Sequence, residues 1–293
     1  MKTMSMITKS ILLVLLTGGI LFTSCKKEGK ISAQDEEATL ESTVNDAEAD
    51  GAFDEVFNTT MGIGVEAGDD IGLTGGIGVF GRMEGDVSGR GQRCFTLTVT
   101  PTAPGAFPKT VVLDFKDGCL GPDGKLRKGK IITVYTGPMR APGSKATTTF
   151  DGYKVDSMKV EGTHEVVNNS TSNNRILTVR VIGAKLTWDS GRWVRWSTVR
   201  TTTQLEGNGT PAFPMDDVFQ ITGAGRGENS RGITWAHEIT EPLIKRFACR
   251  WISKGIVRIK YNAVFGLLDF GDGRCDNKAT LTINGRTKEI TLR

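Results

Sequence analysis

The chain contains only two histidines, and each is followed directly by a glutamate, in His164-Glu165 and His237-Glu238. Histidine beside a carboxylate could take part in acid–base chemistry or bind a metal. Neither histidine lies in a metal-binding spacing such as HExxH. Neighbouring residues of a strand point to opposite faces, so within a strand neither pair can act together. The histidines therefore predict no catalytic site.

Hard oxygen donors gather near two of the cysteines and could hold Ca²⁺. They are Asp117, Asp123, Asp269, Asp272, Asp276 and Asn277. Their spacing does not match an EF-hand loop, and Asp-Gly is a common turn dipeptide. The Gly-rich stretch 223–227 lacks the Lys-Ser/Thr ending of a phosphate loop. We therefore predict no metal and no cofactor, and we expect a protein that is not an enzyme.

Four basic side chains lie within six residues, at Lys125, Arg127, Lys128 and Lys130. The preceding Asp123-Gly124 turn would place them at the entry of a strand, in contact with solvent. Such a cluster can bind an anionic partner, here lipopolysaccharide or an acidic glycan. Alternatively, these residues protect a strand edge from aggregation. The sequence leaves both interpretations open.

Two tryptophans, Trp188 and Trp193, flank a turn made by residues 189–192. If the two rings pair across a hairpin, they share one face of the sheet. An exposed aromatic pair of this kind could stack on a sugar ring or contact a partner. Ordinary cross-strand packing is the alternative, since aromatic pairs stabilise sheets.

Cys25 is a candidate for covalent lipid attachment. The N-terminal segment before it carries two lysines and no acidic residue, and a short apolar run and the small pair Thr23-Ser24 follow. This order is that of a secretory signal peptide. A cysteine at this place is acylated and becomes the first mature residue. The apolar run is too short to span a bilayer, which takes about 20 residues. We therefore expect residues 1–24 to be a lipoprotein signal peptide and acyl chains on Cys25 to anchor the protein to a membrane.

The four remaining cysteines favour two disulfides, as expected in an exported chain. Cys94 and Cys119 are 25 residues apart, and Cys249 and Cys275 are 26 apart. Each interval reads as two strands joined by a loop, and the ends of an antiparallel hairpin meet. We therefore predict the pairs Cys94–Cys119 and Cys249–Cys275, each closing the base of a hairpin.

Charge is distributed unevenly along the chain. Residues 31–70 contain twelve acidic and no basic residues, whereas residues 71–293 contain 32 basic and 20 acidic residues. Apolar residues from Ala33 to about Asn58 recur at helical spacings, which predicts one or two short helices packing through Phe53 and Phe57. A partly disordered acidic arm is the alternative. We take residues 25–61 as tether and acidic helical segment.

Residues 62–92 are rich in glycine and predict a flexible linker. Residues 93–293 read as a β-domain, because runs rich in Thr, Val and Ile alternate with period two and are separated by turn dipeptides. Strands so regular, joined by short turns, imply an antiparallel meander. The predicted fold is mainly β: an elongated curved antiparallel sheet or, as the alternative, a two-sheet sandwich.

Several segments resemble a group of Bacteroidota envelope lipoproteins that share a GC…DGR.RKGKI segment. The residues that carry this resemblance are Gly118-Cys119, the run from Gly121 to Ile131, Tyr135-Thr136-Gly137, Phe150 to Tyr153, Glu161-Gly162-Thr163 and Cys275-Asp276-Asn277. Ser24-Cys25 is similar to the looser lipoboxes of the same bacteria. The resemblance implies location and a β-rich body, and it implies no activity.

These observations together predict a lipid-anchored protein of the cell envelope, at the outer membrane and facing the periplasm or the cell surface. The expected role is binding or structural rather than enzymatic, and nucleic acid is excluded as a partner by this compartment. A lipid or amphiphile carrier is the first alternative, and it requires a continuous apolar face on a concave sheet. An enzyme acting on envelope glycans is the second, and it requires two carboxylates in a cleft.

Overall fold

A computed structural model describes residues 32–61, 94–103, 105–121, 124–172, 174–210, 214–249 and 251–292. Cys25, the signal peptide and the Gly-rich segment 62–92 lie outside these residues. So do Pro122 and Asp123, which precede the basic cluster.

The body is one antiparallel sheet, which the described residues build from fourteen strands. Its order is that of the sequence, from β1 to β14, with the short β3 pairing only with β4. The strands are β1 (Thr96–Thr100), β2 (Lys109–Asp114), β3 (Cys119–Leu120), β4 (Leu126–Tyr135), β5 (Lys145–Val155), β6 (Met158–Asn168), β7 (Ile176–Trp188), β8 (Trp193–Glu206), β9 (Val218–Asn229), β10 (Thr234–Arg246), β11 (Ile252–Tyr261), β12 (Val264–Asp272), β13 (Lys278–Ile283) and β14 (Arg286–Thr291). A short 3₁₀ helix, η1 (Pro214–Asp216), precedes β9.

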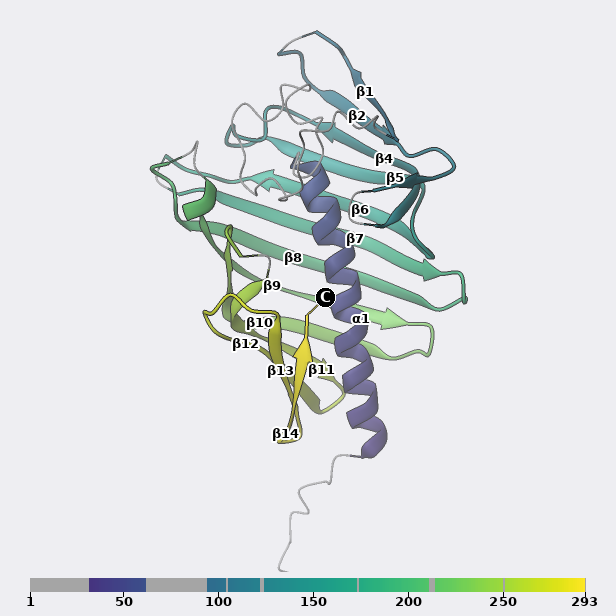
Figure 1. Cartoon of the computed structure of the whole chain (residues 1–293), viewed down its shortest axis with the longest axis vertical. Coiled ribbons are helices and arrows are strands. Elements are labelled where there is room, and N and C mark those ends of the chain that lie inside the picture. Colours follow the sequence, from purple (N-terminus) through teal and green to yellow (C-terminus); the bar gives the residue numbers. More distant parts are fainter. Residues whose placement is uncertain are drawn as a thin grey trace, which may run out of the picture. The chain divides into compact units, whose positions relative to one another are not determined.

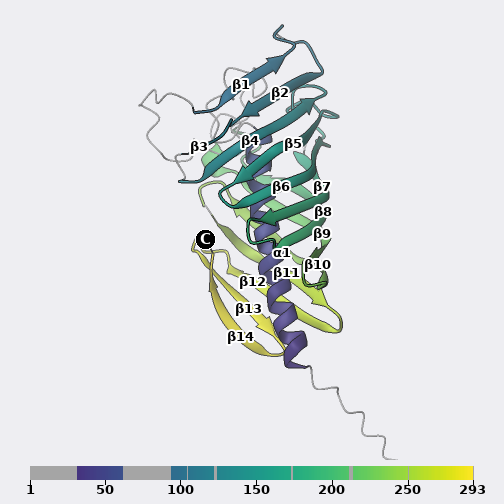
Figure 2. The same cartoon turned by 90° about the vertical axis from the view of Figure 1, so that its right-hand side faces the viewer.

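The predicted fold class is confirmed: the protein is mainly β, with an antiparallel meander preceded by an acidic helix. The sheet is curved and bends around the helix α1 (Ala33–Thr60) (Figure 2). Of the two architectures expected, the curved sheet is the one found, since every strand belongs to the same sheet. Two strands, β3 and β9, were not expected from the sequence, and β9 pairs along most of its length with both β8 and β10.

The acidic segment forms a single helix of 28 residues, not two short ones. Ser32 caps its N-terminus by accepting a hydrogen bond from the backbone N–H of Asp35 at 3.0 Å. Asp35 and Glu36 lie in the first turn, where the helix dipole favours negative charge. Gly51 does not interrupt the helix, although glycine is a weak helix former. Contacts with the sheet along its whole length stabilise it instead.

The helix crosses the strands on the concave face of the sheet (Figure 1). Its buried side is largely polar and includes Thr39, Ser42, Thr43, Asn45 and Asp46, with Ala49, Phe53 and Val56 further along. Leu40 and Val44, part of the apolar set with helical spacing, face outward and are 39 % and 50 % exposed. Specific polar contacts therefore dock this helix as much as apolar burial does. No helix in the described part of the chain has the length and apolar character needed to cross a membrane.

Both predicted disulfide pairs are present. Cys94 is bonded to Cys119 and Cys249 to Cys275, with sequence separations of 25 and 26 residues. The first pair encloses β1 and β2, and the second encloses β11 and β12, so each closes a two-strand unit as expected. Closing a loop of this length contributes about 3–4 kcal/mol in the chain-entropy account.

Candidate functional site

The interface between α1 and the concave face of the sheet contains ion pairs and buried polar contacts between residues far apart in the sequence. The helix carries nine acidic and no basic residues. Basic side chains from strands and turns far apart in the sequence meet them along the helix. The ion pairs are Glu36 with Arg286, Glu41 with Arg231, Glu48 with Arg192, Asp50 with Arg200, and Glu55 with Lys125 and Arg127. The acidic arm therefore neutralises part of the basic body of its own chain.

Asp46 is the centre of a buried hydrogen-bond cluster. Its Oδ1 accepts from the indole Nε1–H of Trp196 at 2.8 Å and of Trp235 at 2.9 Å, and it lies 2.7 Å from Nδ1 of His237. Burial alone would raise the pKa of Asp46, but the hydrogen bond and charge of His237 and the two indole donors lower it below its usual value. One carboxylate of α1 thus ties together β8 and β10.

A hydroxyl continues this cluster on the other side of His237. Nε2 of His237 lies 3.2 Å from Oγ1 of Thr198, which is also 3.1 Å from the carbonyl oxygen of Ala224. The order Thr198–His237–Asp46 is that of a hydrolase triad. All three side chains are buried between α1 and the sheet, however, and a nucleophile must reach its substrate. The arrangement therefore holds the helix on the sheet.

Alternate glycines of β9 make room for this cluster. A Cβ at Gly225 would lie 2.5 Å from Cε1 of His237, and a Cβ at Gly227 would lie 2.1 Å from the indole ring of Trp235. Real Cβ atoms do not approach other atoms so closely, so both positions require glycine. The Gly-x-Gly pattern within 223–227 therefore belongs to a strand that makes room for these rings, and neither the strand nor this role was predicted from the sequence.

The other histidine, His164, is fully buried without a polar partner. Neither ring nitrogen has a hydrogen bond, and the ring stacks on Phe53 with centroids 6.3 Å apart and meets Phe57 edge-on. Burial lowers its pKa to about 4, so the imidazole is neutral at neutral pH. Glu165 and Glu238 bond instead to Arg180 and Arg258. The expectation that each His-Glu pair cannot act together is confirmed.

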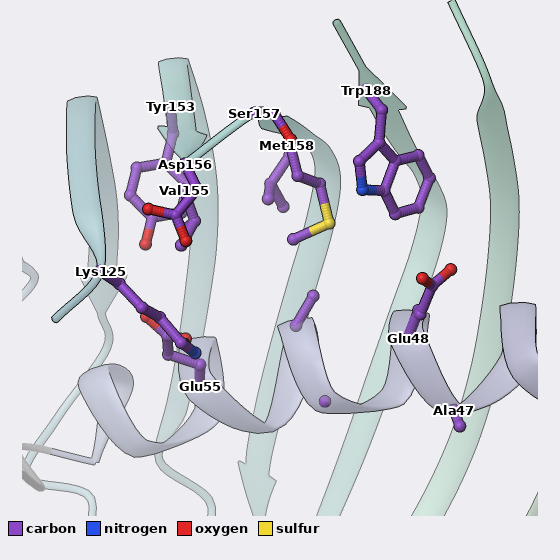
Figure 3. A pocket seen from close by; sticks show the side chains of 13 residues that line it. Ala47, Glu48, Glu55, Lys125, Tyr153, Val155, Asp156, Ser157, Met158 and Trp188 are labelled. Carbon is purple, nitrogen blue, oxygen red and sulfur yellow. The ribbon is translucent and has the colours of Figure 1, made fainter. Parts of the chain in front are cut away.

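A cavity of about 320 Å³ lies between α1 and one end of the strands β5, β6 and β7 (Figure 3). Tyr153, Met158 and Trp188 supply its aromatic and thioether surfaces, and smaller apolar residues complete the wall. On the helix side the cavity is lined by Gly51, where a Cβ would meet no atom within 4 Å. The glycine therefore leaves open space that any other residue would begin to fill.

Charged side chains also line this cavity, and they are bonded to other groups of the same chain. Glu48 bonds to Arg192, whose guanidinium covers one face of Trp188 at 3.5 Å. Glu55 bonds to Lys125, and Asp156 accepts from the backbone N–H of Leu126 at 2.9 Å. The surface offered to a ligand is therefore mainly apolar, and charged side chains that line it are bonded within the chain.

The predicted anion-binding cluster lies at the same interface. Lys125 and Arg127 contact Glu55 of α1, and Nζ of Lys130 lies 3.9 Å from Asp114 and 4.0 Å from Asp151. Carboxylates of the same chain thus approach three of the four side chains. Binding of an external anion by Lys125, Arg127, Lys128 and Lys130 stays a prediction.

The tryptophans at the β7–β8 turn do not share a face, so that expectation is wrong. The residue opposite Trp193 is Thr187, which places Trp188 on the other side of the sheet. Trp188 faces α1 and lines the cavity. Trp193 lies between Lys185 and Arg195, at 5.8 and 4.7 Å from their charged groups. Residues 188–192 connect the paired positions Thr187 and Trp193, one residue more than the predicted turn of residues 189–192.

No group of three His, Cys, Asp or Glu side chains in the described ranges is placed to hold a metal ion. Of the candidate calcium ligands, Asp272 instead bonds to Arg274, and Asp269 and Asp276 accept backbone N–H groups two residues on. These are the turn roles that Asp commonly has. Comparison with protein-family models, with curated proteins and with solved structures found no match.

Proposed function

We propose that this protein is a lipid-anchored protein of the cell envelope that binds, without turnover, the apolar part of a small amphiphile in the cavity between α1 and the sheet. The observation that supports this most is that the lining is mainly apolar and that charged groups in it are already bonded within the chain. Tyr153, Met158 and Trp188 line the interior, whereas Glu48, Glu55 and Asp156 are already bonded to the chain. A hydrocarbon group fits inside, and its polar head stays in water.

The size of the cavity limits what it can take. Ligand pockets in proteins span about 300–1,000 Å³, so a volume of about 320 Å³ is at the small end. A single short acyl chain or one ring system suits this space, whereas a two-chain lipid would leave most of its surface outside. Each methylene transferred from water contributes about 0.8 kcal/mol, so binding should strengthen with chain length until the cavity is full.

Gly51 leaves room for a ligand on the helix side of the cavity. Glycine in a helix interior costs about 1 kcal/mol relative to alanine. Nothing lies within 4 Å of a Cβ at this position, so close packing does not require glycine. Gly51 is exposed and lines the cavity, so a large side chain at this position would project into the space that a ligand would take.

Gly51→Leu should weaken ligand binding while leaving the protein at least as stable as the wild type. The measurement is a fluorescence titration with the neutral probe N-phenyl-1-naphthylamine, with competition by decanoate and by shorter fatty acids. We expect the Kd of Gly51→Leu to rise about tenfold or more, which corresponds to about 1.4 kcal/mol. The leucine occupies the space that the ligand would take.

Two control variants separate filling of the cavity from other effects. Gly51→Ala gives the same gain in helix propensity and adds only one methyl group, so it should bind nearly as the wild type does. Glu37→Leu adds the same side chain at an exposed position of α1 outside the cavity. Equal affinity of Gly51→Leu and the wild type, or no binding by the wild type, would contradict the proposed site.

The anchor is supported by the sequence around Cys25 and has its own test. Cells grown with an alkyne-bearing fatty acid should incorporate the label into the wild-type protein, and Cys25→Ala should abolish that incorporation. The variant should also leave the membrane fraction, because two or three acyl chains hold a protein far more firmly than one. A variant that is still labelled and still sediments with membranes would show that the signal was misinterpreted.

A further inference from the structure

The two end strands of the sheet differ in a way that bears on self-association. β14 carries charged side chains at Arg286, Lys288 and Glu289, a common protection of an exposed edge against pairing with another chain. β1 has the sequence Thr-Leu-Thr-Val-Thr and carries no charge. Its residues are threonine, leucine and valine, and threonine and valine are among the strongest strand formers.

β1 pairs on one side only within the described part of the chain. All five residues from Thr96 to Thr100 are in register with β2. Exposure alternates along the strand: the three threonines are exposed, and Leu97 and Val99 are half-buried against the core. Among the described residues, no strand pairs with the outer side of β1, whose alternate N–H and C=O groups can pair with a further strand. The faces of such a strand would lie beside the threonines on one side and beside Leu97 and Val99 on the other.

We infer that β1 pairs with β1 of a second copy of this chain, in an antiparallel arrangement about a two-fold axis at Thr98. This register sets Thr96 opposite Thr100 and Leu97 opposite Val99. Threonines then face threonines on one side of the joined sheet, and apolar residues face apolar residues on the core side. The strand is complementary to itself because Thr-Leu-Thr-Val-Thr has the same pattern in both directions. Such an interface, with the same patch on both partners, is the usual form of a two-fold dimer.

The contact is small, so the association is weak and depends on concentration. A five-residue strand pair buries far less than the 1,200–2,000 Å² or so of a typical stable complex. Attachment of both copies to one membrane would raise their effective concentration, as tethering does generally. The inference itself rests on β1 alone and is independent of the ligand and of the anchor.

A cysteine on the two-fold axis gives a direct test in cells producing the full chain. Thr98 of one copy would face Thr98 of the other, with Cα atoms about 4.5–5.5 Å apart, which suits a disulfide. Thr98→Cys should therefore give a dimer band on a non-reducing gel that reductant removes. Thr287→Cys, the same substitution on the charged edge strand β14, should remain monomeric. Dimers from both variants or from neither, or a band of another mass, would overturn the inference.

Thr98→Lys tests the same edge without a new cysteine. Two lysines facing each other across the axis repel, and the exposed position of Thr98 lets the monomer fold as before. Sedimentation velocity of the full chain in detergent should show a dimer fraction that rises with concentration for the wild type and a monomer for Thr98→Lys. Wild-type protein that stays monomeric across the range, or a variant that dimerises equally, would contradict the pairing of β1 with β1.

Discussion

Asp46→Ala should lower the free energy of unfolding by about 3 kcal/mol or more, because an unsatisfied buried polar group costs about 1–3 kcal/mol and the substitution leaves several such groups without their acceptor. The substitution removes the acceptor of Trp196, Trp235 and His237 at once, and each of these side chains remains buried. It also removes the buried contact that joins α1 to both β8 and β10. The helix should therefore become the first part of the structure to detach.

Urea denaturation of the full chain, followed by far-ultraviolet circular dichroism, measures this effect. Glu37→Ala is the matched control, because Glu37 is an acid on the same helix with an exposed side chain. It should change stability by no more than about 0.5 kcal/mol. If Asp46→Ala cost no more than the control, the cluster around Asp46 would not be what holds the helix on the sheet.

His164→Leu should stabilise the protein and remove part of its sensitivity to acid. Both ring nitrogens of His164 are buried without a partner, and an unsatisfied buried polar group costs about 1–3 kcal/mol. The folded protein keeps this ring neutral down to a pKa of about 4, whereas an unperturbed histidine has a value of 6.5. Between pH 6.5 and 4 the unfolded chain therefore binds more protons, so acidification favours unfolding.

The difference between the two proteins isolates the contribution of His164, because all other groups titrate in both. The wild type should lose about 3 kcal/mol relative to His164→Leu as the pH falls from 6.5 to 4, at 1.36 kcal/mol for each unit of pKa shift. Urea unfolding at half-unit pH intervals across this window gives the measurement. Parallel stability curves for the two proteins would mean that His164 is hydrogen-bonded or charged in the folded state.

Much of the sheet could be predicted because its strands alternate between buried and exposed residues, and this periodicity is local. β9 could not, because three of its buried-face positions are glycines at 223, 225 and 227, which carry no hydrophobic signal. Only the tertiary contacts of Gly225 and Gly227 with His237 and Trp235 show why glycine is needed there. The strand was therefore missed together with the cluster that it accommodates.

The candidate site was largely invisible in the sequence because its parts are distant from one another. Asp46 and His237 are separated by 191 residues, so no local motif connects them. The uneven charge was visible, but it left open whether the basic residues bind an external anion or protect strand edges. The structure pairs six of these basic side chains with carboxylates of α1. Leu40 and Val44 marked a helix correctly, but they face outward, because polar contacts and not their apolar character orient α1.

The central claim is that an apolar group binds between α1 and the sheet beside Trp188. Photolabelling with a decanoic acid that carries a terminal diazirine tests this claim most directly, because mass spectrometry then identifies the peptides that contact the chain end. We expect labels on the segments around Tyr153 to Val160, Trp188 and Gly51, and loss of these labels in Gly51→Leu. Labelling confined to other parts of the sheet, or unchanged in Gly51→Leu, would contradict the account.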